Sequence, residues 1–242
     1  MGERLADWSP RRMARITGLF YLLTIVAGIF AEGFVSNRLV VSGDAAATAN
    51  NILMHTALFR ASFTVYLIEM SSQIVSIALF YELLKPVSQS VSLIAAFLGL
   101  AGCTIKTVGR LFYIAPTFLL GGAPYLKALT LEQVHALALL LLRVNDEGAA
   151  VSLAFFGFHA LLSGWLIFKS TFLPRILGAW SMIAGVGWLT FLYPPLGYRL
   201  FPYLAVVGFL GALATIVWLL VLGVNETRWK EIAAAGEWRF LS

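Results

Sequence analysis

The feature that most constrains this chain is an apolar run over residues 87–120 that contains two cations, Lys106 and Arg110. At about 1.5 Å per residue, a helix of this length exceeds the roughly 30 Å hydrocarbon core of a bilayer. The run therefore predicts a membrane-spanning helix. Because Lys106 and Arg110 are four residues apart, they share one face of that helix. A charge at the bilayer centre costs on the order of 2.5–3.5 kcal/mol, so we expect this face to meet water, acidic partners or a ligand.

Composition extends this conclusion to the whole chain. Of its 242 residues, 60% are hydrophobic and only 12% are charged, whereas a soluble domain carries about 25% charged residues. The sequence therefore indicates an integral membrane protein. Its net charge of +5 does not indicate nucleic-acid binding, because the basic residues fall mostly at the ends of apolar runs, as membrane topology requires. A single cysteine, Cys103, excludes an intramolecular disulfide.

The apolar runs predict an all-α, polytopic transmembrane bundle that forms one domain over residues 1–242. The first run is longer than the apolar region of a secretory signal, so we interpret it as an uncleaved span. Two further segments predict short extracytoplasmic interfacial helices, at about 45–58 and 131–143, and a cytoplasmic tail covers 225–242. We expect the tail to form a short interfacial helix through Trp229, Ile232, Trp238 and Phe240. The six spans are expected at about 16–35, 59–84, 87–120, 149–168, 176–192 and 201–224.

The distribution of Lys and Arg predicts the orientation of these spans. Segments placed inside carry ten of the 17 Lys and Arg residues, and segments placed outside carry four. The remaining three, Lys106, Arg110 and Arg143, lie within or beside spans. Cytoplasmic loops are enriched in these residues, so both termini are expected in the cytoplasm.

The charges within the spans gather at one depth. Glu69 lies about ten residues from the outer end of the second span, and Lys106 about nineteen residues from the inner start of the third. Both therefore fall in the outer half of the bilayer, with Arg110 one turn further out. Asp146 and Glu147 open the fourth span from the same side. This pattern predicts a polar pocket open to the outside rather than a path through the membrane.

We take Glu69 as the candidate acid or base of this pocket. The candidate substrate-binding residues are Lys106, Arg110, Asp146, Glu147, Gln73 and His159.

Each candidate also has a purely structural interpretation. Glu69 and Lys106 can form a buried ion pair that serves packing, and Arg110 can extend to the outer interface and be hydrated there. Asp146 and Glu147 can be hydrated acids at a helix start. They are adjacent and point about 100° apart on a helix, so we do not expect both in one pocket.

The spacing of histidine and glycine residues does not predict a metal site or a nucleotide site. His55, His135 and His159 lack the close spacing of metal ligands, and His159 on an apolar face fits a hydrogen-bonded core residue. Glycines at 99, 102 and 109 fall within one predicted helix and indicate packing rather than a phosphate loop. We therefore expect neither a metal nor another cofactor.

Three stretches carry a resemblance to a known family: residues 18–23 (GLFYLL), 43–52 (GDAAATANNI) and 169–178 (KSTFLPRILG). With them the chain resembles, over nearly its whole length, a bacterial family of six-helix membrane proteins catalogued as a domain of unknown function. The resemblance implies a bacterial cytoplasmic membrane and six spans. It implies no activity.

Two functional classes therefore stay open, and the sequence does not decide whether the protein is an enzyme. In the first, an outer-half pocket binds an amphipathic anionic molecule or a membrane lipid. The chain also has 18 Phe, 8 Tyr and 7 Trp, and aromatic side chains among these could line a site for isoprenoid-like chemistry. In the second, the chain is a small transporter or an accessory subunit, with a homo-oligomer or a partner membrane protein left open. The absence of a repeat between the two halves counts against alternating access.

Overall fold

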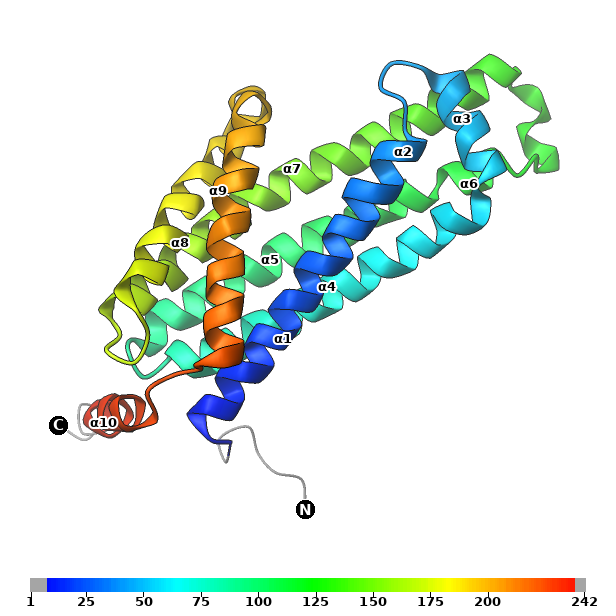
Figure 1. Ribbon diagram of the computed structural model, residues 1–242. Helices are drawn as coiled ribbons and strands as arrows, with labels where there is room; N and C mark the ends of the chain where they lie inside the picture. The colour runs from blue at the N-terminus through cyan, green and yellow to red at the C-terminus, as the bar shows by residue number, and fades with distance from the viewer. Residues whose placement is uncertain (1–7, 238–242) are drawn as a thin grey trace. The chain divides into compact units, whose positions relative to one another are not determined.

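The computed structural model describes residues 8–237, and within that range the chain is helical apart from short connecting turns. Six helical segments are long and apolar enough to cross a membrane. This confirms the all-α fold and the six spans predicted from the sequence. The segments are Pro10–Leu39, Thr56–Leu84, Gln89–Leu119, Leu131–Lys169, Arg175–Leu192 and Pro194–Val221 (Figure 1).

Three of the six segments are single helices, and three consist of more than one helical element. The single helices are α4 (Thr56–Leu84), α7 (Leu131–Lys169) and α9 (Pro194–Val221). The first segment is α1 (Pro10–Gly28), the π-helical η2 (Ile29–Ser36) and α2 (Asn37–Leu39). The third is α5 (Gln89–Ile114) followed by α6 (Pro116–Leu119), and the fifth is α8 (Arg175–Trp188) followed by the 3₁₀ turn η4 (Leu189–Leu192).

Short helices connect or follow these segments: α3 (Ala45–Met54), η3 (Pro124–Ala128) and α10 (Glu226–Glu237). Asp44 caps α3, because its carboxylate accepts a hydrogen bond from the Ala47 backbone N–H at 2.8 Å. In α10, the Trp229 indole N–H donates to the carbonyl of Leu83 at 2.9 Å. The tail thus forms the expected helix with Trp229 and Ile232 packed against a core, while Trp238 and Phe240 lie outside the described residues.

The structure differs from the sequence prediction around residues 131–168. We expected an interfacial helix over 131–143 and a separate span from 149, but α7 runs unbroken from Leu131 to Lys169. The polar stretch between them stays helical because its side chains find partners: Asn145 accepts a hydrogen bond from Arg110, and Arg143 donates to Ser42 Oγ at 3.2 Å. Gly109 and Gly148 also allow the backbones of α5 and α7 to approach closely.

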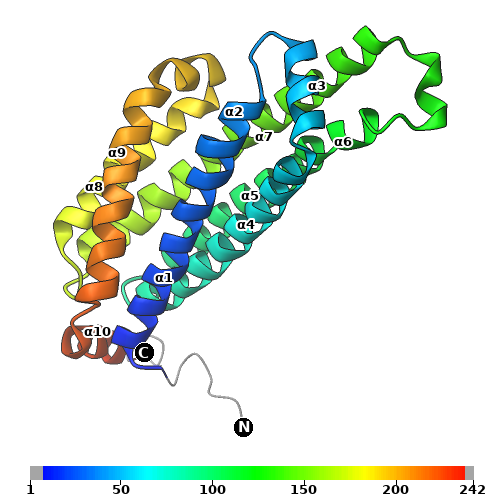
Figure 2. The same ribbon diagram turned by 45° about the vertical axis from the view of Figure 1, so that its right-hand side comes forward.

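The chain divides into two compact units. The first consists of the described residues within 1–22, 72–102 and 153–242. Its core joins five helices through residues such as Ala14, Leu83, Leu166, Leu177 and Leu219. Helices α8 and α9 lie side by side in both ribbon views (Figure 1 and Figure 2).

The same unit contains a contact between α7 and α8 that only small residues allow. Gly157 and Gly164 on α7 face Gly185 and Gly178 on α8, and a Cβ atom built on Gly164 would lie 2.8 Å from the Gly178 carbonyl oxygen. Backbones this close gain van der Waals contact along their whole length, as is common between membrane helices.

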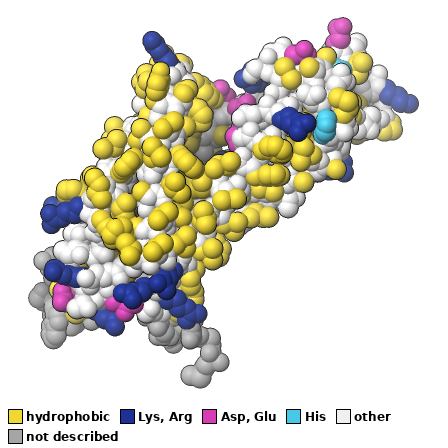
Figure 3. Space-filling view, viewed as in Figure 1, with side chains coloured by type: hydrophobic (Ala, Val, Ile, Leu, Met, Phe, Trp, Pro, Cys, Tyr) yellow, Lys and Arg dark blue, Asp and Glu magenta, His cyan; other side chains and the backbone are white. Residues whose placement is uncertain are grey.

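The surface of this unit is suited to lipid rather than water. On α9, Val206, Val217 and Val221 are each more than half exposed. In the view of Figure 3, hydrophobic side chains cover α9, and Lys and Arg side chains gather near its lower end. Such a surface would be unfavourable in water and is the expected one for a helix within a bilayer.

The second unit consists of residues 23–71 and 103–152. Its core includes Ala31 and Val35 from η2, Phe59 and Tyr66 from α4, and Tyr113 from α5. The charged side chains singled out by the sequence lie around this core.

Candidate functional site: a polar ladder in the second unit

The candidate site is a set of polar side chains that recur at helical spacing on three elements. Gly28, Glu32 and Ser36 follow one another on the α1–η2 segment at intervals of four residues. On α4 the positions are Glu69, Tyr66 and Ser62, and on α5 they are Lys106, Arg110 and Tyr113. Residues three or four apart stack on one helix face, so the three elements meet in successive layers. We call this set the polar ladder.

The first layer is an ion pair between α4 and α5. Lys106 Nζ lies 2.6 Å from Glu69 Oε1, with side chains that are 19% and 7% exposed. This confirms that Glu69 and Lys106 are partners, as the structural interpretation of the sequence required. The other carboxylate oxygen, Glu69 Oε2, is buried and has no hydrogen-bond partner among the described residues.

Gly28 makes room for this pair. A Cβ atom built on Gly28 would lie 3.1 Å from Glu69 Oε1, which is closer than most such contacts in proteins. The absence of a side chain at this position therefore lets α1 pass beside the Glu69 carboxylate.

The second layer is centred on Arg110, which is only 2% exposed. Its Nη1 donates to Asn145 Oδ1 at 2.9 Å, and its guanidinium carbon lies 3.5 Å above the centre of the Tyr66 ring. Its Nη2 lies 3.9 Å from Glu32 Oε2, and its buried Nε has no hydrogen-bond partner within residues 8–237. The structure therefore excludes the arrangement in which Arg110 extends to a hydrated interface.

Glu32 forms the accessible edge of the ladder, because its side chain is 55% exposed. Its Oε2 accepts a hydrogen bond from the Tyr66 hydroxyl at 2.6 Å. The third layer continues from the same hydroxyl: Ser36 Oγ lies 2.9 Å from Tyr66 Oη and 3.4 Å from Tyr113 Oη, and the Tyr113 ring stacks on Phe59 with centroids 4.4 Å apart.

The π-helical turn η2 positions two members of the ladder. It spans Ile29–Ser36 and therefore carries both Glu32 and Ser36. A π-helical segment is rare and occurs often at functional sites, because it re-aims side chains relative to the regular helix.

Asp146 and Glu147 behave differently, as their spacing predicted. Asp146 Oδ1 accepts a hydrogen bond from Asn145 Nδ2 at 3.1 Å, so Asp146 adjoins the Arg110 layer through Asn145. Glu147 is exposed. The structure thus brings Glu69, Lys106, Arg110 and Asp146 into one unit and leaves Glu147 at its surface.

The other two candidates, Gln73 and His159, belong to the first unit. His159 Nδ1 lies 2.8 Å from the carbonyl oxygen of Ala95, and its ring fills the space beside Gly99. This is the hydrogen-bonded core histidine of the structural interpretation. Gln73 is partly exposed on α4.

Several members of the ladder were not among the sequence candidates, nor was Asn145, the partner of Arg110 on α7. These members are Glu32, Ser36, Ser62, Tyr66 and Tyr113. Helical spacing could have found two of them, because Tyr66 lies three residues before Glu69 and Tyr113 three residues after Arg110. Within residues 8–237, no group of three or more His, Cys, Asp or Glu side chains could hold a metal ion.

Fold and surface together define a class: an integral membrane protein with six candidate spans and a buried polar cluster. The chain belongs to the family described as Domain of unknown function (DUF4386), whose model matches residues 16–223. No curated protein and no solved structure matches the chain.

Proposed function

We propose that this protein binds the head group of an amphipathic, anionic small molecule at the Glu32 edge of the polar ladder. One observation carries the proposal: in the described part of the chain, the buried Arg110 has no hydrogen-bond partner at its Nε, and the carboxylate that faces it, Glu32, is 3.9 Å away and 55% exposed. Arg110 is therefore incompletely paired, and its Nη2 is the nitrogen that faces the exposed Glu32 carboxylate.

Glu32 would then lie where the anionic group of a ligand binds. A carboxylate or phosphate that displaces it would receive the Tyr66 hydroxyl and the Arg110 guanidinium as donors. The exchange replaces one anion by another, so the buried cation stays compensated. The planar fork of arginine suits both kinds of oxyanion.

The apolar part of the ligand follows from where the ladder lies. Exposed side chains beside Arg110 on α5, such as Val108 and Leu111, are apolar and more than half accessible. A molecule that reaches a head-group site within such a span must itself be largely apolar, as an acyl or isoprenoid-like chain is. Glu69, with its unpartnered Oε2, would serve as acid or base if the bound molecule is also transformed.

The experiment compares two amphiphiles of equal chain length and opposite charge. The protein, purified in a neutral maltoside detergent, would be titrated with dodecyl phosphate or with dodecyltrimethylammonium while its melting temperature is followed. We expect stabilisation by the phosphate only. Glu32→Gln should increase that stabilisation because a competing anion is removed, and Tyr66→Phe should decrease it because a donor is lost.

Glu147→Gln is the matched control, since it removes an exposed acid of the same unit that lies outside the ladder. It should leave both titrations unchanged. A Glu32→Gln variant that binds the phosphate more weakly, or stabilisation by the ammonium probe alone, would contradict the proposal. A partner protein retained through purification, together with no response to either probe, would favour the accessory-subunit alternative.

A further inference from the structure

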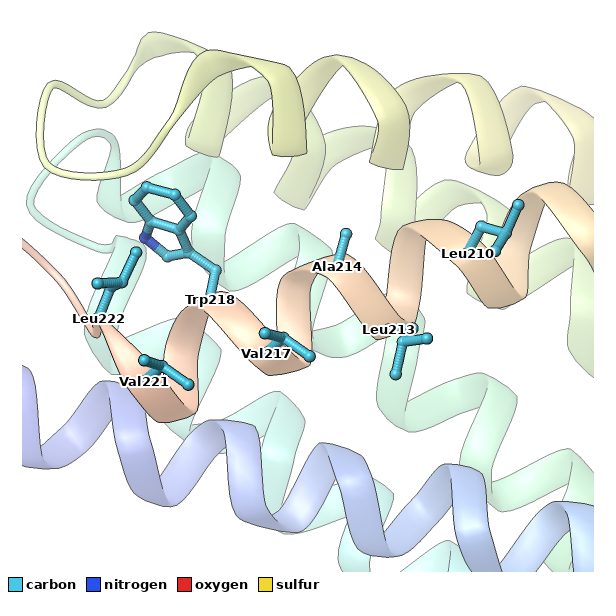
Figure 4. Close-up of a pocket in the computed structure, with 7 residues that line it drawn as sticks. All are labelled: Leu210, Leu213, Ala214, Val217, Trp218, Val221 and Leu222. Atoms are coloured by element: carbon cyan, nitrogen blue, oxygen red, sulfur yellow. The ribbon is translucent and has the colours of Figure 1, made fainter.

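A second candidate site lies in the first unit and is independent of the polar ladder. One face of α9 forms a shallow groove of about 410 Å³, lined only by apolar side chains and by Trp218 (Figure 4). The groove extends along the helix from Leu210 to Leu222. Val217 and Val221, on this face, are 52% and 63% exposed, so the groove is open at the surface.

The length of the groove matches one lipid chain. Twelve residues separate Leu210 from Leu222, which corresponds to about 18 Å along a helix. One leaflet of the hydrocarbon core is roughly 15 Å thick, since the whole core is roughly 30 Å. A groove of this length on a membrane helix therefore fits an acyl chain that lies parallel to α9.

Cations lie at the Leu222 end of the groove. Arg15 Nη2 is 3.5 Å from the carbonyl oxygen of Val221, and Arg11 packs its stem against Gly223, just beyond α9. Arg11 and Arg15 are four residues apart on α1 and both are exposed. Among the described residues neither has an acidic side chain within ion-pair distance. Their positive charge is therefore available to an anion at this end.

Trp218 adds an amphipathic group at the same end. Its indole points along the groove toward Leu222 (Figure 4). Tryptophan side chains are enriched where the apolar core of a membrane meets the head groups, because the ring is apolar and the N–H donates a hydrogen bond. The groove is thus wholly apolar near Leu210, while near Leu222 it includes Trp218 and has the exposed Arg11 and Arg15 beside its end.

We propose that this groove binds one anionic phospholipid, with an acyl chain along α9 and its phosphate beside Arg11 and Arg15. The order of chemistry along the site is that of the lipid itself, an apolar chain followed by a charged head group. A neutral or zwitterionic phospholipid would fill the same groove with less attraction to the arginines.

The first experiment tests the charge. The delipidated protein would be titrated with phosphatidylglycerol or with phosphatidylcholine of identical acyl chains, and the bound fraction read by native mass spectrometry. We expect tighter binding of phosphatidylglycerol, and a loss of roughly fivefold in its affinity for each of Arg11→Gln and Arg15→Gln. Arg199→Gln, which removes an exposed cation at the opposite end of α9, is the control and should have little effect.

The second experiment tests the groove. Val217→Trp places a large side chain on the exposed face of the groove without entering the core, and it should weaken binding of the lipid. Val206→Trp makes the same change at an equally exposed position of α9 outside the groove, and it should not. Equal affinity for the two lipids, or equal losses in the variants and their controls, would show only general annular lipid and would overturn the proposal.

Discussion

Arg110 and the Glu69–Lys106 pair show what a buried charge requires inside a membrane protein. Each removes a charge from water, and each recovers the cost through specific partners: a carboxylate for Lys106, and an amide, an aromatic face and a more distant carboxylate for Arg110. These contacts make the two cations parts of the fold, whatever they bind.

Removal of one partner of the Glu69–Lys106 pair should be far more damaging than removal of both. Glu69→Gln or Lys106→Met leaves an uncompensated buried charge, which costs roughly 3–5 kcal/mol when the pair is fully buried. Because Lys106 is 19% exposed, we expect the lower part of that range. The double variant should recover much of the loss in a double-mutant cycle of the free energy of unfolding in detergent. Strictly additive effects would show that the two side chains are not coupled.

Arg110→Lys should also destabilise the protein, although it keeps the charge. Lysine lacks the planar fork that donates to Asn145 while it stacks on Tyr66, so we expect a loss of about 1–3 kcal/mol. Arg60→Lys, at an exposed position of α4 in the same unit, is the control and should cost less than about 0.5 kcal/mol. Unchanged thermal stability of Arg110→Lys would mean that the buried contacts of Arg110 contribute little.

At the scale of elements, features set by the apolar pattern of a single helix could be predicted from the sequence. Features that depend on contacts between distant helices could not. The apolar runs predicted six spans, and the depth of Glu69 and Lys106 predicted their pairing. The continuity of α7 depends on contacts of Asn145 and Arg143 with residues 35 and 101 positions away, which no local pattern contains. The π-helical conformation of η2 likewise has no local sequence pattern that predicts it. This element carries Glu32, a ladder residue that was not among the sequence candidates.

The glycine contact between α7 and α8 gives a prediction at this scale. A Cβ atom on Gly178 would overlap the backbone of Phe168 and lie 2.6 Å from the Gly164 carbonyl oxygen, so neither neighbour can move aside as a flexible side chain would. Gly178→Val should therefore separate the two helices and cost roughly 3 kcal/mol. Gly33→Ala is the control, because the added methyl group would meet only Ile29 Cγ2 at 3.9 Å. The melting temperatures of the two variants in the same detergent would make the comparison.

At the scale of the whole molecule, the bilayer explains both the length of the apolar helices and their exposed apolar side chains. Six apolar segments and their exposed valine, leucine and phenylalanine side chains fix the class of protein. Which end of each span faces the cytoplasm is a separate question, because helix length and composition are the same in either orientation. Only the asymmetry of Lys and Arg, ten against four, bears on it.

That asymmetry predicts that the turn carrying Tyr125 is extracytoplasmic and that α10 is cytoplasmic. Both can be tested in a Cys103→Ala background, which removes the chain's single thiol. Tyr125→Cys and Thr227→Cys place new thiols at exposed positions, in η3 and α10. In intact cells a membrane-impermeant maleimide should modify Tyr125→Cys and spare Thr227→Cys, and permeabilised cells should show modification of both. The opposite pattern in intact cells would invert the topology and move the Glu32 edge of the polar ladder to the cytoplasmic half. Modification of both thiols in intact cells would instead require an even number of crossings between them, which conflicts with the three candidate spans that separate η3 from α10.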